Sequence, residues 1–263
     1  MKNVEIFKLA VLNELENLLC SRQIKIIVLD ETVSTSTYLL DLIKEEYCDN
    51  VAVIAFRQSG GRGRSGRIWH SDNANNLYIS IAVNVSGDLS EIFPMVPLAA
   101  GVSIAKVLTG FGYKHLKLKW PNDLLFNGRK VAGILCETPG LKKNSAIGVI
   151  GMGVNFSENR FPDDIAEIAA ELADMKNIPL PSRESVSARW IIEVLSHIES
   201  LESGNTEKLV NEWKSFGEPF GRKVQTGGVK GTTVDLARSG RLIIKTETGE
   251  QFEIPGGIVE YID

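Results

Sequence analysis

The sequence predicts an α+β protein, in which a central mixed or antiparallel sheet is flanked by helices and followed by a small β-barrel. Three observations carry this prediction. Apolar residues at helical spacing alternate with short strand-like apolar runs through residues 1–216. An Asn-Gly pair between two apolar runs is typical of a β-hairpin. From Gly217 onward, short β-rich pieces separated by glycine pairs replace the longer elements.

The first element is an amphipathic helix within residues 1–20. Its acidic residues interrupt any apolar core of a signal peptide, and no small-residue cleavage site follows. No stretch approaches 18 consecutive apolar residues, the length that would suggest a membrane span. We therefore expect a soluble, cytoplasmic protein. The apolar residues recurring at helical spacing are Ile6, Leu9, Ala10, Leu12, Leu15, Leu18 and Leu19.

The remaining elements of the main body follow in order, and residue types support each of them. Ser34 is a suitable N-cap for the first helix after the opening strand. Asn127-Gly128 predicts the hairpin turn between residues 124–126 and 131–135. Strands are expected at residues 24–29, 51–56, 77–85, 116–120 and 146–154, and helices at residues 34–47, 97–111, 163–174, 185–202 and 206–216.

The C-terminal part, from Gly217 onward, has shorter and more closely spaced expected strands than the main body. Five short strands in under 50 residues suggest a small barrel of the SH3-like type. We place a domain boundary near residue 216, which gives domains of residues 1–216 and 217–263. The expected strands are residues 223–225, 232–236, 242–245, 252–254 and 258–262.

Composition excludes several classes of protein. In a chain of 263 residues, 43% apolar residues supply a globular core and exclude general disorder. A net charge of −4 gives no global reason to bind DNA or an anionic membrane. The chain has no C-x-x-C motif and three scattered histidines, which argues against a disulfide framework, a structural zinc site and a His-rich metal centre. The three cysteines are Cys20, Cys48 and Cys136.

One segment departs from this average charge. Residues 51–71 contain no Asp or Glu but carry four arginines within eleven residues. The neighbouring glycines let the backbone approach a ligand, and their N–H groups can bind phosphate oxygens. We call residues 60–68 the Arg/Gly loop and interpret it as an anion site, with a flexible solvated loop as the alternative. The arginines are Arg57, Arg62, Arg64 and Arg67, and the glycines are Gly60, Gly61, Gly63 and Gly66.

Two phosphate-binding motifs nearly match this loop. Residues 61–66 fit G-x-G-x-x-G, but a dinucleotide fingerprint must open a helix, and Ile68-Trp69 leads into a strand instead. A P-loop needs Lys and Ser or Thr after its last glycine, whereas Arg67-Ile68 follows Gly66. An enclosed site for an anion, such as a nucleotide, is the interpretation that remains.

A second constellation lies in the Lys-Trp-Pro-Asn-Asp run of residues 119–123. Asn122 can hydrogen-bond a ligand, and Asp123 can hold Mg²⁺ or neutralise a cation, although an ordinary Asx turn is equally compatible. The hairpin brings Lys130 back toward this end, where its charge suits a phosphate or a developing oxyanion. Gly133 leaves room for a planar ligand against the backbone. The strand glycines Gly148, Gly151 and Gly153 suit a close approach of the same kind.

Five motifs in order resemble those of the biotin protein ligases. They cover residues 34–155, and they are Ser34-Thr35, Gly61 to Trp69, Lys119 to Asp123, Arg129 to Leu135 and Gly151 to Asn155. The resemblance implies a class II synthetase-like biotin/lipoate ligase fold with an SH3-like C-terminal domain. It also implies an AMP-forming ligase that joins biotin and ATP into biotinyl-5′-AMP, with Mg²⁺. Biotin is then passed to a lysine of the biotin carrier domain of a carboxylase.

The same resemblance implies residue roles. Contacts to biotin fall to Ser34, Thr35, Gln58, Gly61, Arg62, Lys130 and Gly133. Contacts to ATP fall to Arg64, Arg67, Trp69 (against adenine), Asn122, Lys130 and Asn155. The catalytic set is Arg64, Lys130 and Asp123, with Asp123 also the protein's magnesium ligand. The chain departs from the family pattern at Ser36, at Ser59-Gly60 and at Ser65, where a basic residue is usual.

Physical chemistry supports such a reaction. A carboxylate and a triphosphate repel each other, so the site must supply cations and exclude water. Arg62, Arg64, Arg67 and Lys130 are suitable cations, and no nucleophile on the enzyme is required. We hypothesise that the Arg/Gly loop closes over the adenylate to protect it from water.

Two rival functions and two questions of assembly remain open. A lipoate or octanoate ligase or transferase of the related fold carries an R-R-x-x-G-G-G motif instead. A nucleic-acid-binding module would need a broader basic face with interleaved aromatic residues. Bifunctional relatives carry a winged-helix domain ahead of the motifs, and the 33 residues before Ser34 leave no room for one, so we expect no DNA binding. A homodimer is possible through the central strands.

Overall fold

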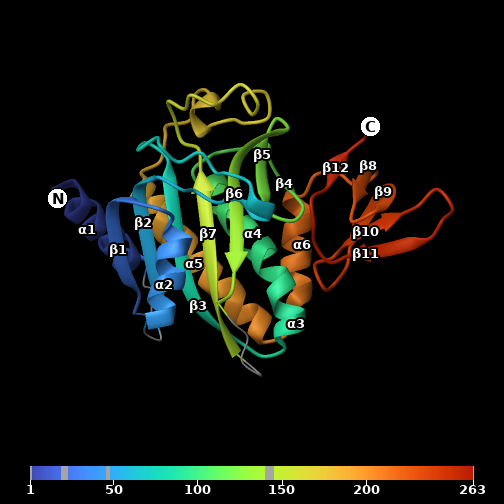
Figure 1. The fold of residues 1–263 in the computed structure, drawn as a ribbon, viewed down its shortest axis with the longest axis horizontal. Helices are drawn as coiled ribbons and strands as arrows, with labels where there is room; N and C mark the ends of the chain where they lie inside the picture. Colours follow the sequence, from blue (N-terminus) through green and yellow to red (C-terminus); the bar gives the residue numbers. More distant parts are fainter. Residues whose placement is uncertain (1, 19–22, 46–47, 140–144, 263) are drawn as a thin grey trace.

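The computed structural model describes residues 2–18, 23–45, 48–139 and 145–262. Figure 1 shows a large sheet with helices on both faces and a small second sheet beside one edge of it. This arrangement confirms the predicted α+β class with a central mixed sheet. The sequence predictions made for Leu19, Cys20 and Tyr47 lie outside the described residues.

The large sheet has seven strands in the order β1-β2-β3-β7-β6-β5-β4. β1 and β2 are parallel, and the other neighbours are antiparallel. The central strands β2, β3 and β7 are buried along nearly their whole length, as expected for strands covered on both faces. The strands are β1 (Lys25–Thr32), β2 (Val51–Gln58), β3 (Leu77–Ser86), β4 (Leu116–Lys119), β5 (Asp123–Phe126), β6 (Arg129–Glu137) and β7 (Ser145–Val154).

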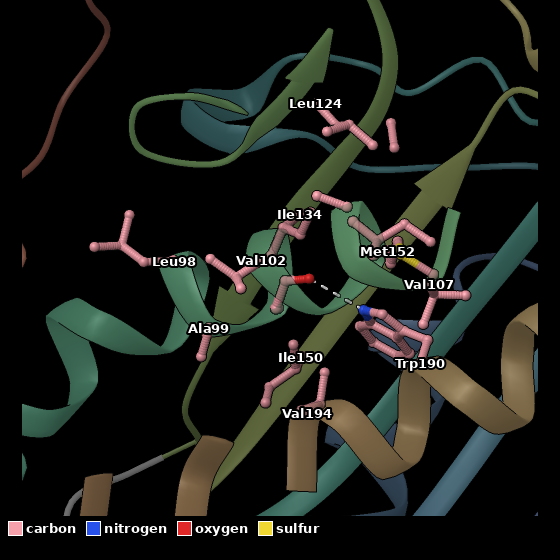
Figure 2. Close-up of a cluster of buried hydrophobic side chains, with 14 of the residues drawn as sticks. Leu98, Ala99, Val102, Val107, Leu124, Ile134, Ile150, Met152, Trp190 and Val194 are labelled. Atoms are coloured by element: carbon pink, nitrogen blue, oxygen red, sulfur yellow. Dashed lines mark hydrogen bonds between the residues drawn. The ribbon is translucent and has the colours of Figure 1, made fainter. Parts of the chain in front are cut away.

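Helices cover the two faces of this sheet unequally (Figure 1). α2 (Thr35–Glu45) packs on one face, where Leu39 meets a small cluster from β2, β3 and β7. The other face carries the main core, in which the Trp190 indole donates a hydrogen bond to the Ala100 carbonyl at 3.2 Å (Figure 2). The elements on that face are α1 (Lys2–Asn17), α3 (Leu89–Ile92), η2 (Phe93–Met95), α4 (Val96–Gly110), α5 (Arg183–Glu202) and α6 (Thr206–Phe216).

The helical stretch Leu89–Gly110 is long and apolar enough to span a membrane by length and composition, with a mean hydropathy of 1.7. Within that stretch, 72% of an 18-residue apolar segment is buried inside the protein. Its apolar side chains therefore form the core beneath the sheet.

The small sheet has five antiparallel strands in the order β11-β10-β9-β8-β12 and fits an SH3-like domain. It contacts the β4 edge of the large sheet, where the Trp120 indole donates to the Gly240 carbonyl at 2.9 Å and Lys119 Nζ lies 4.4 Å from the centre of the Tyr261 ring. The division of the chain at residue 216 stays a prediction. The strands are β8 (Lys223–Thr226), β9 (Val229–Leu236), β10 (Leu242–Lys245), β11 (Gln251–Ile254) and β12 (Glu260–Tyr261).

The expected hairpin forms where the sequence predicted it. Asn127 and Gly128 both have positive φ, 50° and 77°, as the turn between β5 and β6 requires. The helix predicted over residues 163–174 is wrong, because only the short 3₁₀ turn η3 (Leu172–Asp174) lies there. Ala170 N donates to the Lys130 carbonyl at 2.9 Å instead, so pairing with β6 replaces a helical bond.

The amphipathic helix predicted at the N-terminus forms, but only part of its apolar spacing is buried. Ile6 and Leu9 are 63% and 52% exposed, whereas Phe7, Val11 and Leu15 are buried. These three residues are spaced four apart, so they form one face of the helix. Phe7 packs edge-on against Phe56 of β2 with ring centres 5.4 Å apart, and this contact fixes which face of the helix is buried.

This orientation of α1 predicts opposite outcomes for one substitution at two positions. Leu15→Ala should lower the free energy of unfolding by about 2–5 kcal/mol, because it leaves a cavity in the core. Leu9→Ala on the exposed face should change it by less than about 0.5 kcal/mol. Urea denaturation followed by circular dichroism measures both, and equal losses would contradict the orientation.

Candidate functional site

The Arg/Gly loop has a defined, hydrogen-bonded conformation. Gly63 N donates to the Arg67 carbonyl at 2.7 Å and Trp69 N to the Gly61 carbonyl at 3.0 Å, which makes the loop a small hairpin. At its base, Gly60 N donates to the Val33 carbonyl at 2.8 Å. A Cβ at Gly61 would overlap its neighbours, so a glycine is required there. The loop is thus held as an ordered cover next to β2.

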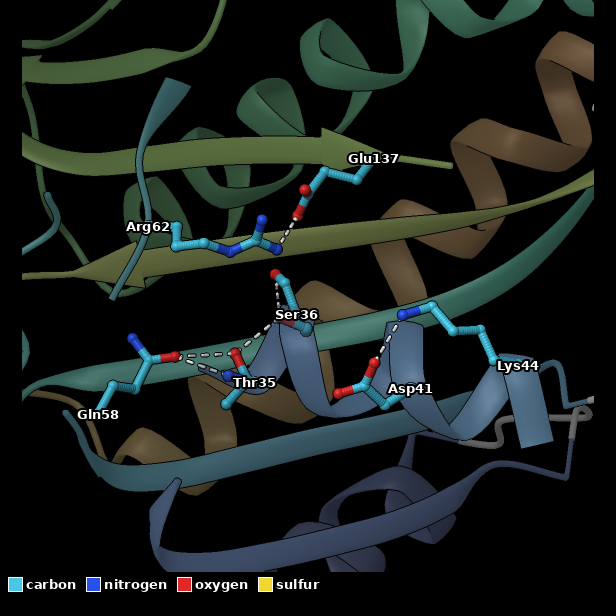
Figure 3. A network of polar contacts seen from close by, with 8 residues as sticks. Thr35, Ser36, Asp41, Lys44, Gln58, Arg62 and Glu137 are labelled. Atoms are coloured by element: carbon cyan, nitrogen blue, oxygen red, sulfur yellow. Dashed lines mark hydrogen bonds and ion pairs between the residues drawn. The ribbon is translucent and has the colours of Figure 1, made fainter. Parts of the chain in front are cut away.

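A chain of buried polar side chains lies beneath the loop (Figure 3). Gln58 Oε1 accepts from Thr35 N at 2.8 Å, and Thr35 Oγ1 lies 2.7 Å from Ser80 Oγ. Ser80 Oγ lies in turn 2.9 Å from Ser36 Oγ. These groups, with Gly151, line a cavity of about 50 Å³. Donors and acceptors therefore alternate along the wall of an otherwise apolar sheet.

Two glycines of β6 and β7 support the indole of Trp69. Gly133 and Gly153 are direct cross-strand neighbours. A Cβ at Gly153 would overlap the indole nitrogen, and one at Gly133 would lie 3.1 Å from indole Cζ3. Lys130 Nζ lies 5.2 Å from the centre of the ring, a cation–π distance. The indole of Trp69 thus lies against Gly133, and the planar ligand expected there stays a prediction.

The Lys-Trp-Pro-Asn-Asp run meets the hairpin as predicted. Lys130 Nζ lies 2.7 Å from Asp123 Oδ1. Asn122 Nδ2 donates to the Ile134 carbonyl at 2.8 Å, and Asn122 Oδ1 accepts from Arg64 at 2.9 Å. These bonds reach β6 and the Arg/Gly loop, so the Asn122 side chain connects three segments and does more than close an Asx turn. Burial lowers the pKa of Arg64, and the charge of Asp123 opposes that shift.

The outer part of the site is a larger cavity of about 650 Å³ along the Arg/Gly loop. Arg62, Arg64 and Arg67 line it together with Leu135 and Glu137. In this cavity Arg62 donates to Glu137 Oε2 at 2.6 Å (Figure 3). The volume lies within the range common for small-molecule sites.

Asn155, directly after β7, has a buried side chain. Its Nδ2 donates to the Ala170 carbonyl at 3.0 Å and lies 3.5 Å from the Lys130 carbonyl. Asn155 therefore lies beside Lys130 and ties the segment after β7 to β6. It does not line the two cavities, nor does Asp123.

The structure brings most predicted site residues together. Predicted residues that line one or both cavities are Thr35, Ser34, Gln58, Gly61, Arg62, Arg64, Arg67, Trp69, Asn122, Lys130 and Gly133. Sequence reasoning missed Ser80 and Glu137. A serine inside the apolar run of β3 was a usable signal for Ser80, since a buried hydroxyl needs a partner. Nothing local distinguished Glu137 from other strand-end acids.

Other reactive residue types occupy structural positions. Burial raises the pKa of the Cys136 thiol, so the thiol stays protonated and unreactive at neutral pH. His197 lies between Ser103 and Glu212, at 3.1 and 2.8 Å, in an order that resembles a catalytic triad. Ser103 is completely buried and within 2.8 Å of the Ala99 carbonyl, so no substrate reaches it.

The arrangement of acidic residues bears on how a metal ion could bind. Within the described part of the chain, no group of three or more His, Cys, Asp or Glu side chains can hold a metal ion. Asp123 offers a carboxylate next to Lys130. Mg²⁺ bound with nucleotide phosphates commonly needs only one or two protein carboxylates. Asp123 is the carboxylate next to Lys130 that would take that role, although it lines neither cavity itself.

The arginine-lined cavity and the hydroxyl-lined pocket together offer charged and hydrogen-bonding groups to a small anionic ligand. The sequence profile of the biotin/lipoate A/B protein ligase family matches residues 28–155. The matched segment belongs to that family, and the resemblance of its motifs to those of the biotin protein ligases is confirmed.

Three relatives show the extent of the similarity. The bifunctional ligase/repressor BirA of Salmonella typhimurium is 32% identical over 73% of this chain, which spans 59% of the relative's length. The biotin–[acetyl-CoA-carboxylase] ligase of Mycobacterium tuberculosis is 29% identical over 74% of this chain and 73% of its own. The biotin protein ligase of Aquifex aeolicus, solved with biotin and ATP, has a TM-score of 0.76 and 27% identity, covering 90% and 98% of the two chains.

The position of Trp69 predicts an effect of one methyl group. Gly153→Ala should displace the indole, because the new Cβ would overlap the ring nitrogen. The emission assigned to Trp69, obtained by subtracting the spectrum of the matching Trp69→Phe variant, should then shift to longer wavelength. Gly148→Ala on the same strand is the control, since its nearest contact is an ordinary 3.5 Å to Phe93. Unchanged emission in Gly153→Ala would show that the indole does not rest on this glycine.

Proposed function

We propose that this chain activates biotin with ATP to biotinyl-5′-AMP in the cytoplasm and then transfers biotin to a lysine of a carboxylase's biotin carrier domain. The observation that carries the proposal is the ordered Arg/Gly loop over a hydroxyl-lined pocket, next to the Lys130–Asp123 pair. The similarity to a biotin protein ligase solved with biotin and ATP supports it. Residues 1–216 would form the catalytic domain and residues 217–263 a supporting domain.

The inner pocket suits the head of biotin. A cyclic urea has two N–H donors and one strong acceptor, and the chain of Gln58, Thr35, Ser80 and Ser36 offers both kinds of partner. The acid tail of biotin would then extend toward Lys130. The proposed biotin contacts are Ser34, Thr35, Gln58, Gly61, Arg62, Lys130 and Gly133.

The outer cavity suits ATP. Its arginines match phosphate oxygens in charge and geometry. Trp69 would lie against the adenine. Mg²⁺ would neutralise phosphate charge, with Asp123 as its ligand from the protein. The proposed ATP contacts are Arg64, Arg67, Trp69, Asn122, Lys130 and Asn155.

Catalysis would rest on charge and position. The carboxylate of biotin attacks the α-phosphorus, a new C–O–P bond forms, and the bond to pyrophosphate breaks. Arg64 and Lys130 offset the repulsion between the two anions, and hydrogen bonds to charged groups contribute about 1.5–3 kcal/mol each. Holding both reactants in line can lower the barrier by about 7–11 kcal/mol. The carrier lysine then attacks the mixed anhydride and releases AMP.

Biotin-dependent exchange of pyrophosphate into ATP tests the function. Exchange should depend on added biotin and not on lipoate, which separates the proposal from a lipoate or octanoate ligase of the related fold. The names of the relatives favour biotin. Exchange with lipoate alone, or none with biotin, would contradict the proposal.

Lys130 should be required for adenylate formation. Lys130→Ala removes the cation and leaves the carboxylate of Asp123 as an additional uncompensated anion near the phosphates. We expect adenylate formation to fall more than about tenfold, equivalent to about 1.4 kcal/mol of transition-state stabilisation. Single-turnover formation of biotinyl-5′-AMP measures it.

Lys44→Ala is the matched control, because Lys44 lies on α2 in an exposed pair with Asp41. This variant should react at the wild-type rate. A Lys130→Ala rate equal to that of Lys44→Ala would remove Lys130 from the proposed mechanism.

A further inference from the structure

We propose that Glu137 is a positioning residue that, through Arg62, holds the Arg/Gly loop over the bound acid and slows its release. The pair joins the loop to the end of β6, at 2.6 Å between Arg62 and Glu137 Oε2 (Figure 3). This inference rests on the proposed function for the identity of the acid. The contact itself belongs to the protein alone.

The loop is fastened by side chains at two separate points. Arg64 reaches Asn122 at the turn between β4 and β5. Arg62 reaches Glu137, the last residue of β6 and three residues beyond the Ile134 that Asn122 bonds. Trp69 rests on Gly133 and Gly153, on the side of Ile134 away from Glu137. Two arginines of the loop, Arg62 and Arg64, thus fasten it to neighbouring segments at two places.

Arg62 lines both the inner and the outer cavity, whereas Glu137 lines only the outer one. The Arg62 side chain thus covers the inner pocket, which contains Ser36 and Gly151. Glu137 binds the guanidinium end of Arg62 from the outer cavity. In the described part of the chain, Glu137 forms no hydrogen bond or ion pair with Thr35 or Lys130. Its effect on a ligand in the inner pocket must therefore pass through Arg62.

The exposure of the pair suits a contact that opens and closes. The side chains of Arg62 and Glu137 are 40% and 24% exposed, so water and salt weaken their attraction. Such pairs contribute little to folding. Removing the charge of Glu137 should accordingly leave the fold intact while it frees the loop.

Limited trypsin digestion without ligand tests the contact. Glu137→Gln should speed cleavage after Arg64 and Arg67 in the loop, and Glu137→Asp, which keeps the charge, should restore slow cleavage. Asp41→Asn is the control, because it breaks an exposed pair outside the site (Figure 3). Cleavage of Glu137→Gln at the Asp41→Asn rate would overturn the proposal even if the protein used another acid.

Steady-state exchange kinetics test the consequence. For Glu137→Gln, the KM for biotin should rise about fivefold, the upper end of what a part-exposed ion pair supplies, with kcat within about twofold. In an Arg62→Met background, which keeps the stem but not the charge, Glu137→Gln should add no further change. An unchanged KM, or additive effects of the two substitutions, would overturn the proposal.

Discussion

Gly133 of β6 and Gly153 of β7 face each other across an antiparallel pair, and the side chains they lack leave a flat area in the middle of a buried sheet. A side chain at either position would overlap Trp69 or Lys130. Gly151 extends the area, since a Cβ there would lie 2.5 Å from Ser36 Oγ. The indole and the polar chain therefore depend on a close backbone approach that only glycine permits, whereas Lys130 meets Gly133 with the flexible end of its side chain.

The charges of the site are arranged around this flat area. The chain as a whole is acidic, yet the Arg/Gly loop brings three arginines above the sheet. Two of them are held by partners from the sheet, Asn122 and Glu137, and Lys130 is held by Asp123. The protein's own groups thus position these cations, and charges positioned in this way need little reorganisation to stabilise an anion.

The predictable parts of the structure were those set by local chemistry. Asn127-Gly128 specifies its turn, and the turn brings Lys130 back toward Asp123. The buried face of α1 was less predictable, because Ile6 and Phe7 are both apolar and the contact with Phe56 decides between them. Ser80 and Glu137 act through partners distant in sequence, Thr35 and Arg62, which no local pattern reveals.

The wrongly predicted helix at residues 163–174 bears on Lys130 itself. Lys130 N donates to the Ile168 carbonyl at 2.7 Å, and the Lys130 carbonyl accepts from Ala170 N at 2.9 Å. A helix over these residues would use the same backbone groups internally, and β6 would lose this neighbour. Arg129 adds an ion pair to Asp174 at 3.1 Å that holds the segment in place. The helix preference of residues 163–174 is thus overridden, because the backbone of this segment pairs with Lys130. The sequence-based prediction fails where the backbone of the proposed catalytic lysine is held in place.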